Sequence, residues 1–228
     1  MKLSVIYEDN HILVAEKPAG IPSQADASGA EDMLGLVKRY VKEKYQKSGE
    51  AYIGLLHRLD RPAAGLMVFA RTSKAAARLS KQIREGRMQK AYLAVLQGKN
   101  LPEKGRLEDF LYKDTRLNRS RIAAPDDPGA KFAALEYEVL ARRAGQALVC
   151  VHLLTGRPHQ IRLQFASRGW PLLGDAKYGS GGQDLALYSY YLGFTHPTKN
   201  ERMQFFFLPT AKAFAPFAQA MDNLKISG

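Results

Sequence analysis

The sequence has little that would support redox, metal or nucleotide-cofactor chemistry. Cys150 is the only cysteine in 228 residues, which excludes internal disulfides and cysteine-rich zinc sites and is typical of a reducing cytoplasm. The five histidines show no HExxH spacing, and there is no GxxxxGK[ST] loop, strand-to-helix GxGxxG or GxSxG elbow. We therefore expect a cytoplasmic protein without a metal, with Cys150 buried among apolar neighbours.

Long apolar runs and acidic residues are also scarce. No run approaches the ~20 apolar residues that span a bilayer, so we expect no membrane segment. Asp and Glu number 22 against 34 Lys and Arg, which gives a formal net charge of +12. This excess predicts a polyanionic partner, nucleic acid before a membrane surface. The alternative is a housekeeping protein whose surface is basic throughout.

The order of predicted elements favours one α+β domain over residues 1–228. We find no repeat, low-complexity tract or linker that would divide the chain. Hairpin-linked strands with interspersed helices predict a mixed, mainly antiparallel sheet flanked by helices. Strands are predicted at 5–7, 12–15, 52–56, 66–70, 90–96, 107–112, 120–124, 132–140, 147–154, 187–194 and 203–208. Helices are predicted at 31–47, 72–85 and 213–224, with another opened by Thr155 and Pro158 and ended by Gly169.

Residues 57–65, HRLDRPAAG, form the central stretch of the chain, between two apolar runs. Pro62 disfavours helical geometry at Arg61, so the stretch is predicted to be an extended turn, and Gly65 permits a close return into the next strand. The turn presents Asp60 between two arginines, an arrangement suited to a nucleophile or an acid–base group. The alternative is a surface turn that carries an ion pair.

Two segments concentrate positive charge. One face of the helix predicted at 31–47 carries Lys38, Arg39, Lys42 and Lys44, and the loop within 113–131 contains Arg116, Arg119 and Arg121. Both segments are candidates for contact with RNA phosphates. A charged helical face is also what solvation alone produces.

Three positions offer complementary chemistry for a nucleotide. Asp60 supplies a carboxylate, Arg162 a guanidinium that would keep a carboxylate ionised, and Tyr92 a ring that would stack on a base. Together they would suit attack on a nucleotide. Their spacing along the chain does not show that they meet in space.

Four ordered motifs give the chain a resemblance to the RluA-type family of RNA pseudouridine synthases over nearly its whole length. Residues 7–20, YEDNHILVAEKPAG, are similar to the family's opening motif, and HRLDR at 57–61 followed by Gly65-Leu66 is similar to its catalytic motif. KAY at 90–92 resembles the tyrosine strand. LTGRPHQIR at 154–162 resembles the third motif, which continues through PLLGD at 171–175.

This resemblance implies a role for each candidate residue and a reaction that needs no cofactor. Asp60 would be the nucleophile that lets uracil leave its ribose carbon, turn and rejoin through C5, by attack on either the sugar or the base. Arg162 would pair with Asp60, and Tyr92 would stack on the uracil. Arg58 would enter the RNA helix where the base is flipped out, and Ile161 would line the uracil pocket or serve the core. The implied partner is a tRNA or rRNA stem-loop.

The chain departs from the family pattern in three places. Pro62-Ala63-Ala64 replaces a segment that usually carries Thr and Ser, so two hydroxyls that would tie the catalytic turn are missing, and Tyr188 stands where a His is frequent. Because the opening motif begins at Tyr7, we expect no N-terminal S4-like RNA-binding domain. His57, His159 and Gln160 are expected to brace the two motifs, and we expect a monomer.

Two other functions remain open at this point. An RNA-binding or assembly protein of the same fold, without activity, would fit the altered segment 62–64. An Asp-dependent nucleoside hydrolase would release free uracil instead of an isomerised base.

Overall fold

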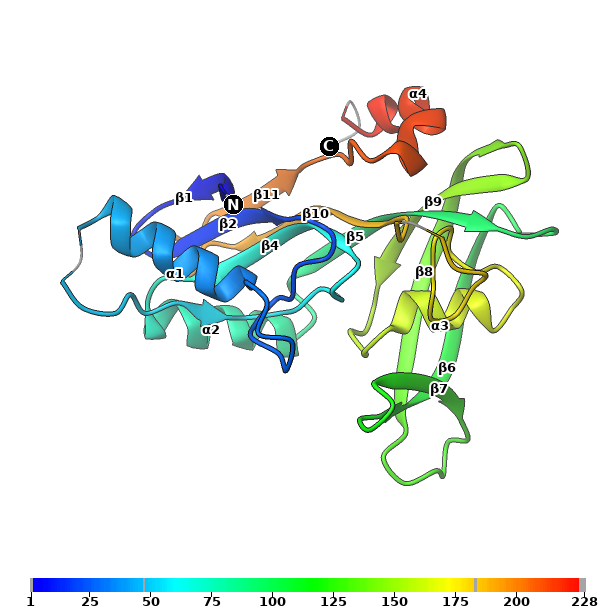
Figure 1. The fold of residues 1–228 in the computed structure, drawn as a ribbon, viewed down its shortest axis with the longest axis horizontal. Helices are drawn as coiled ribbons and strands as arrows, with labels where there is room; N and C mark the ends of the chain where they lie inside the picture. Colours follow the sequence, from blue (N-terminus) through cyan, green and yellow to red (C-terminus); the bar gives the residue numbers. More distant parts are fainter. Residues whose placement is uncertain (1, 47, 183, 226–228) are drawn as a thin grey trace. The chain divides into compact units, whose positions relative to one another are not determined.

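The computed structural model of the protein describes residues 2–46, 48–182 and 184–225. It forms two compact units: unit 1 comprises Met1–Gln89 and Ser189–Phe207, and unit 2 comprises Lys90–Tyr188 and Leu208–Gly228. Lys47 and Gln183, which end the predicted helix at 31–47 and the glycine-rich loop after Gly174, lie outside the described residues. Each unit combines an antiparallel sheet with helices, which confirms the α+β prediction (Figure 1). The prediction of one catalytic domain over 1–228 stays a prediction.

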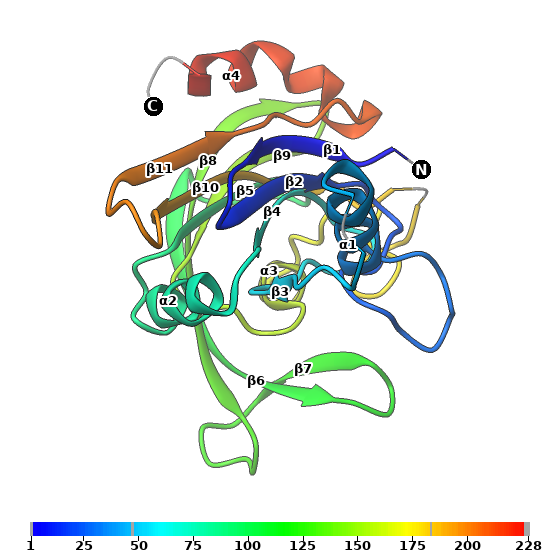
Figure 2. The same cartoon turned by 90° about the vertical axis from the view of Figure 1, so that its left-hand side faces the viewer.

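Unit 1 is built on strands in the order β1-β2-β4-β10. These are β1 (Ser4–Glu8), β2 (Ile12–Lys17), β4 (Ala64–Ala70) and β10 (Leu187–Thr195), with the short β3 (Gly54–Leu55) beside β4 and β11 (Arg202–Phe206) beside β10. Helices α1 (Met33–Lys44) and α2 (Ser73–Arg84) flank these strands (Figures 1 and 2). The sequence pattern predicted a helix at both places.

The two helices begin at the side chains that cap them. Asp32 accepts the Gly35 amide at 3.0 Å, and Thr72 accepts the Ala75 amide at 3.1 Å. The apolar face of α2 packs Leu79 onto Val14 of β2 and Val68 of β4, in a core that also takes Ile12, Leu66, Met88, Leu192, Phe194 and Phe205. Because alternate side chains of β2 and β4 are held in this core, the ends of both strands and the loops that follow them are fixed in position.

Unit 2 contains antiparallel strands in the order β5-β9-β8-β6-β7. They are β5 (Gln89–Gln97), β6 (Lys104–Asp114), β7 (Arg119–Ala123), β8 (Lys131–Arg143) and β9 (Gln146–Leu153). A two-residue turn joins β8 to β9, with φ of 50° at Ala144 and 74° at Gly145, as a tight hairpin requires. Cys150 on β9 is buried, as predicted.

Three predicted elements differ from the structure. The strand predicted at 52–56 is reduced to β3. The helix after Thr155 begins only at Gln160 (α3, Gln160–Ala166), because the Thr155 hydroxyl binds the Ala134 amide at 2.9 Å and the Gln160 side chain at 2.8 Å instead of capping a helix. The last helix is split into the 3-10 turn η1 (Lys212–Phe217), α4 (Ala218–Asp222) and η2 (Asn223–Lys225), with Pro216 inside η1.

Candidate active site

The Asp60 turn is held by hydrogen bonds to the backbone on both of its sides. The Leu59 amide donates to Ser23 Oγ at 3.0 Å, and Ser23 Oγ donates back to the Leu59 carbonyl at 2.8 Å. The Ala63 amide closes the turn on the Asp60 carbonyl at 3.0 Å. Ser23 is buried. It supplies, from a distant part of the chain, a hydroxyl tie of the kind that is missing at positions 63 and 64.

Lys17 is a fully buried lysine that contacts the other side of the turn. Its Nζ donates to the carbonyls of Pro18 at 2.9 Å, Ile21 at 2.7 Å and Arg61 at 3.0 Å, which matches the three N–H donors of an ammonium. Burial lowers the pKa of Lys17 to about 7, while the charge of Asp60 acts to raise that pKa and the charge of Arg61 to lower it. Lys17 thus places a titratable amine in the electrostatic field of Asp60.

Arg61 ties the same turn to the loop that follows β2. Its Nε donates to the Gly20 carbonyl at 3.0 Å and its Nη1 to Ser28 Oγ at 3.2 Å, and Nη1 lies 3.7 Å from Asp26 Oδ2. The sequence predicted that the turn presents Asp60 between two arginines. In the structure the Arg61 guanidinium contacts the 20–28 loop. Arg58 is exposed.

Gly65 and His57 fix the ends of the turn. Gly65 has φ of 117°, and a Cβ there would lie 2.3 Å from the Ser189 carbonyl oxygen, so the close approach of β4 to β10 requires glycine. His57 Nε2 accepts the Val68 amide at 3.1 Å, which braces the start of the turn against β4 as predicted. The turn is thereby anchored at both ends to one strand.

Arg162 in unit 2 belongs to a buried, bidentate ion pair. Its Nε lies 2.8 Å from Asp175 Oδ2 and its Nη2 lies 2.7 Å from Asp175 Oδ1, and both side chains are at most 5% exposed. Burial alone would raise the pKa of Asp175. The hydrogen bonds and charge of Arg162 outweigh burial, with help from the amides of Lys177 and Tyr178, and lower that pKa. Asp175 therefore fixes the plane and direction of the guanidinium.

Tyr178 links Arg162 to the basic β6–β7 hairpin. Its ring lies beneath two guanidinium groups, with centroid distances of 5.3 Å to Arg162 and 5.2 Å to Arg119. Its hydroxyl accepts the Ser120 amide at 2.7 Å and lies 2.7 Å from His159 Nδ1. His159 thus braces the start of α3 through Tyr178, while the Gln160 side chain donates to the Ala134 carbonyl at 3.0 Å.

The two remaining candidates in unit 2 are buried apolar or aromatic side chains. Tyr92 lies on β5 opposite Val151 of β9 and is 5% exposed, and Ile161 on α3 is 4% exposed. Asp60 and Arg58 belong to unit 1, whereas Tyr92, Ile161 and Arg162 belong to unit 2. That these side chains meet in one site stays a prediction.

Sequence reasoning missed Lys17, Ser23 and Asp175 as parts of this machinery. Lys17 and Asp175 stand inside the quoted motifs, but nothing in their local pattern names a partner 44 residues or 13 residues away. The available signal was chemical. A lysine in an otherwise apolar strand end and an aspartate in a buried turn each need a partner to be stable inside a protein.

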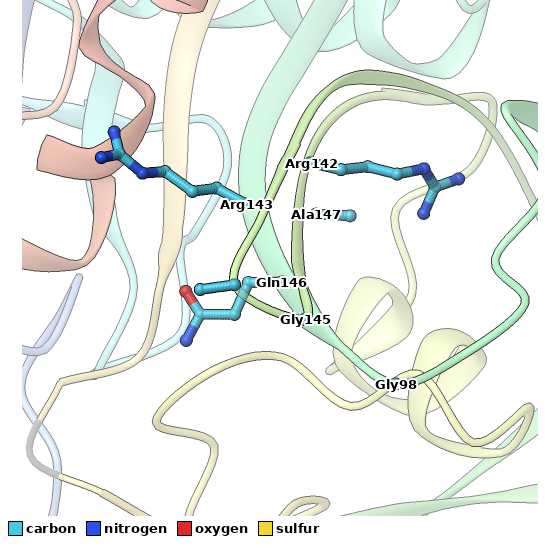
Figure 3. Close-up of a pocket in the computed structure, with 7 residues that line it drawn as sticks. Gly98, Arg142, Arg143, Gly145, Gln146 and Ala147 are labelled. Atoms are coloured by element: carbon cyan, nitrogen blue, oxygen red, sulfur yellow. The ribbon is translucent and has the colours of Figure 1, made fainter.

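A surface hollow at the β8–β9 turn is not a substrate site of this kind. It has a volume of about 270 Å³ and is lined by Gly98 and residues 142–147. Arg142 and Arg143 point to opposite sides of it (Figure 3). Arg142 binds Glu103 at 3.1 Å and Arg143 binds the Pro216 carbonyl at 3.2 Å. These arginines do not converge on a common ligand.

Within the described residues, no group of three or more His, Cys, Asp or Glu side chains is arranged to hold a metal ion. Among the helices formed by the described part of the chain, none has the length and apolar character of a bilayer span.

Comparison with known proteins decides the family. A family model described as RNA pseudouridylate synthase matches residues 11–167, a stretch that includes Asp60, Tyr92 and Arg162. The chain belongs to this family. It is 34% identical to an uncharacterized RNA pseudouridine synthase of Bacillus subtilis, over 98% of this chain and 71% of that protein. It is 30% identical to ribosomal large subunit pseudouridine synthase D of Zymomonas mobilis, over 89% of this chain and 68% of that protein.

Membership of the RNA pseudouridylate synthase family confirms the RluA-type resemblance and the activity of an RNA uridine-to-pseudouridine isomerase. The fold agrees as well. Human RNA pseudouridylate synthase domain containing 4 superposes with a TM-score of 0.76 at 20% identity, over 97% of this chain and 93% of that chain.

Proposed function

We propose that this pseudouridine synthase isomerises uridines in large-subunit ribosomal RNA. The observation that carries the choice of rRNA over tRNA is the likeness to proteins named ribosomal large subunit pseudouridine synthase D. Those of Zymomonas mobilis and Nitrosomonas europaea are each 30% identical to this chain, over 89% and 97% of it. The net charge of +12 suits a large polyanion. We further propose that the protein acts in the cytoplasm as a monomer.

Asp60 is the proposed nucleophile of this reaction. In the isomerisation the C1′–N1 bond of uridine breaks, a C1′–C5 bond forms, C5 loses its proton to solvent and N1 gains one, so no cofactor is consumed. A carboxylate attached to a turn that is tied at Leu59, Arg61 and Val68 has little freedom to move away from a bound base. Whether it attacks the sugar or the base, the same positioning serves it.

Arg162 and Tyr92 are the proposed partners of Asp60. The bonds to Asp175 involve Nε and Nη2 of Arg162 and fix the plane of its guanidinium, which we propose also pairs with Asp60. Its charge would keep Asp60 ionised. Tyr92 would stack on the flipped uracil, with Ile161 beside it, and exclude water from the reacting atoms.

Two features support contact with a flipped base and its flanking RNA. Arg58, exposed at the edge of the catalytic turn, would fill the gap left by the base, offsetting part of an unstacking cost of a few kcal/mol. The β6–β7 hairpin carries exposed Arg116, Arg119 and Arg121 with Leu117 at its tip. Two of these arginines stack on aromatic rings, Arg119 on Tyr178 and Arg121 on Tyr112, which prearranges flat cations for phosphates.

The product formed on defined RNA tests this proposal. Unmodified large-subunit rRNA and a tRNA mixture, both transcribed with 5-tritiated uridine, are incubated with the protein, and tritium release, pseudouridine and free uracil are measured. We expect tritium release with pseudouridine in the rRNA. Pseudouridine only in tRNA would overturn the choice of substrate, free uracil would indicate a hydrolase, and no reaction with retained binding would indicate a silent RNA-binding protein.

A further inference from the structure

Unit 1 carries a second concentration of positive charge that the proposed active site does not use. Helix α2 exposes Lys74, Arg78 and Lys81 along one stripe, at spacings of four and three residues, with Arg84 beside it. The turn between β10 and β11 adds exposed Lys199 and Arg202. We call these six residues the α2 basic face.

Hydrogen bonds hold the β10–β11 turn against α2, so the two segments form one surface. The Gln82 side chain donates to the Thr195 carbonyl at 2.7 Å and accepts the Thr195 amide at 2.9 Å. Arg78 donates to the Pro197 carbonyl, and Arg202 donates to Gln89. Because Gln82 is buried, this attachment is part of the fold, and the exposed cations occupy fixed relative positions.

Few carboxylates lie among the cations of the α2 basic face, so little of its positive charge is offset by negative charge nearby. Arg78 and Arg202 bind neutral carbonyl or amide oxygens. Segments 72–89 and 195–202 contain only two acidic residues, Glu85 and Glu201. Glu85 is paired with Arg87, which lies outside the six residues of this face, and its Oε1 also lies 3.8 Å from Lys81 Nζ. Hydrogen bonding from Arg87, together with the charges of Arg87, Lys81 and Arg84, lowers the pKa of Glu85.

Helix α1 is equally rich in cations, but three of its cations are paired with carboxylates. Arg39 pairs with Glu31, Lys44 pairs with Glu8, and Lys42 lies 3.7 Å from Glu50. The hydrogen bond that Lys44 donates to Glu8 raises the pKa of Lys44, and the one that Arg39 donates to Glu31 raises the pKa of Arg39. Arg39, Lys42 and Lys44 of the predicted α1 face thus each belong to an ion pair, and substituting these three residues provides a control of matched charge.

We propose that the α2 basic face binds the phosphate backbone of the substrate RNA away from the target uridine. The inference rests on the proposed RNA substrate and adds a second contact to it. A helix of 12 residues extends about 18 Å, long enough to follow several successive phosphates. Contacts with phosphates do not distinguish one base from another, so this face would add affinity and orientation while the catalytic turn selects the nucleotide.

Two triple variants of equal charge and composition test the proposal. Lys74→Gln/Lys81→Gln/Arg84→Gln removes charge from the α2 basic face, and Arg39→Gln/Lys42→Gln/Lys44→Gln removes two lysines and one arginine from α1. Binding is measured by filter retention from 50 to 200 mM KCl, on whichever transcript the wild type converts, rRNA or tRNA. Circular dichroism and thermal melting of each variant report whether it is folded.

The α2 variant should have a salt dependence shallower by about 2–3 in the slope of log K against log salt, from a slope of 0.7–0.9 per phosphate contact. Over this salt range the wild type should therefore lose about 20–40-fold more affinity than the α2 variant. The α1 variant should keep a slope within about 1 of the wild type.

Equal slopes for the two variants would overturn the inference while leaving the proposed function intact, since the effect would then belong to overall charge. Unchanged binding by a folded α2 variant would overturn it as well. Failure of the wild type to bind or convert either RNA would overturn the proposed function together with this inference.

Discussion

The two parts of the proposed active site are held in place by different means. In unit 1, Asp60 lies on a turn whose backbone is fixed by Lys17, Ser23 and the close approach at Gly65. In unit 2, Arg162 is fixed through its own charged end, by the buried carboxylate of Asp175 and the ring of Tyr178.

This difference shows how each group can be both positioned and reactive. A carboxylate that attacks must stay ionised and must be held close to the reacting atoms, so positioning of its turn through the backbone suits Asp60. A guanidinium cannot lose its charge in a protein, so a buried carboxylate can orient it without cost to its electrostatic role. Variants of the two parts should therefore differ in stability and in rate.

The largest effect is expected in unit 2, from Asp175→Asn. Removing one charge of a buried pair should cost about 3–5 kcal/mol in the free energy of unfolding, because the buried guanidinium of Arg162 loses the carboxylate that binds it in two places. Asp109→Asn is the control, since the Asp109–Arg168 pair is partly exposed, at 14% and 28%, and should cost about 1 kcal/mol. Urea unfolding measures both. Equal costs would contradict the special role of the buried pair.

The pH dependence of the same pair has a defined sign. The folded pKa of Asp175 lies below its usual value of 3.8, so the folded protein binds this proton more weakly than the unfolded chain. The stability that Asp175 contributes should be present above about pH 4 and decline as the pH falls through the folded pKa. The gap between wild type and Asp175→Asn, followed by unfolding from pH 6 to pH 3, should narrow. A constant gap would contradict the lowered pKa.

Gly65→Ala should have the next largest effect, through the Asp60 turn. Its Cβ would meet the backbone of Ser189, and its positive φ is unfavourable for alanine, so we expect a loss of about 3 kcal/mol or more. Gly20→Ala is the matched control: its φ of 84° is also positive, but nothing lies within 4 Å of a Cβ there, so about 1–2 kcal/mol should be lost. Similar losses in both variants would mean that the contact with β10 does not set the turn.

A smaller effect is expected from Ser23→Ala. The variant leaves the buried amide and carbonyl of Leu59 without their shared hydroxyl, at a cost of about 1–3 kcal/mol, and it should slow tritium release because Asp60 is less well placed. Ser28→Ala, in the exposed loop bound by Arg61, should change stability by less than about 0.5 kcal/mol. A Ser23→Thr variant keeps the hydroxyl and should restore the rate. No recovery with threonine would count against the hydroxyl.

Lys17→Met should cost about 1–3 kcal/mol in the free energy of unfolding at neutral pH, because the carbonyls of Pro18, Ile21 and Arg61 lose their donor, while the rate falls about tenfold or more through misplacement of the turn. The folded pKa of about 7 lies below the usual 10.5, so the unfolded chain retains a proton that the folded protein releases. Wild-type stability relative to Lys17→Met should therefore rise with pH between about 7 and 10.5. Parallel unfolding curves at pH 6.5 and 9.5 would argue against a lowered pKa.

Local signals in the sequence were enough to predict part of the fold. Helix α2 was predicted at 72–85 and lies at Ser73–Arg84, because its cap, its apolar spacing and the following Gly86 all act within a few residues. The hairpin of β1 and β2 and the long strands of unit 2 follow from alternation in the same way. Such elements are set by neighbours in the chain.

Contacts between distant residues could not be predicted in this way. The start of α3 was placed too early because Thr155 looked like a cap, while its hydroxyl is bound to Ala134, 21 residues away. The sequence showed that two hydroxyls usual at positions 63 and 64 are missing, but not that Ser23, 36 residues from Leu59, supplies a hydroxyl to the same turn. Asp175 was part of a quoted motif, but its bond to Arg162 depends on how the loop after Gly174 folds back.

The most direct test of the account is the single-turnover rate of tritium release by Asp60→Asn, compared with Asp26→Asn on 5-tritiated large-subunit rRNA. Asp26 is a neighbouring, exposed aspartate that pairs with Arg61, so its variant matches the change in charge near the turn. The account predicts that Asp60→Asn is slowed by at least about a thousandfold, the scale on which a catalytic side chain is missed, while Asp26→Asn stays within a few-fold of the wild type. Rates for Asp60→Asn close to those of the wild type would contradict the assignment of the nucleophile.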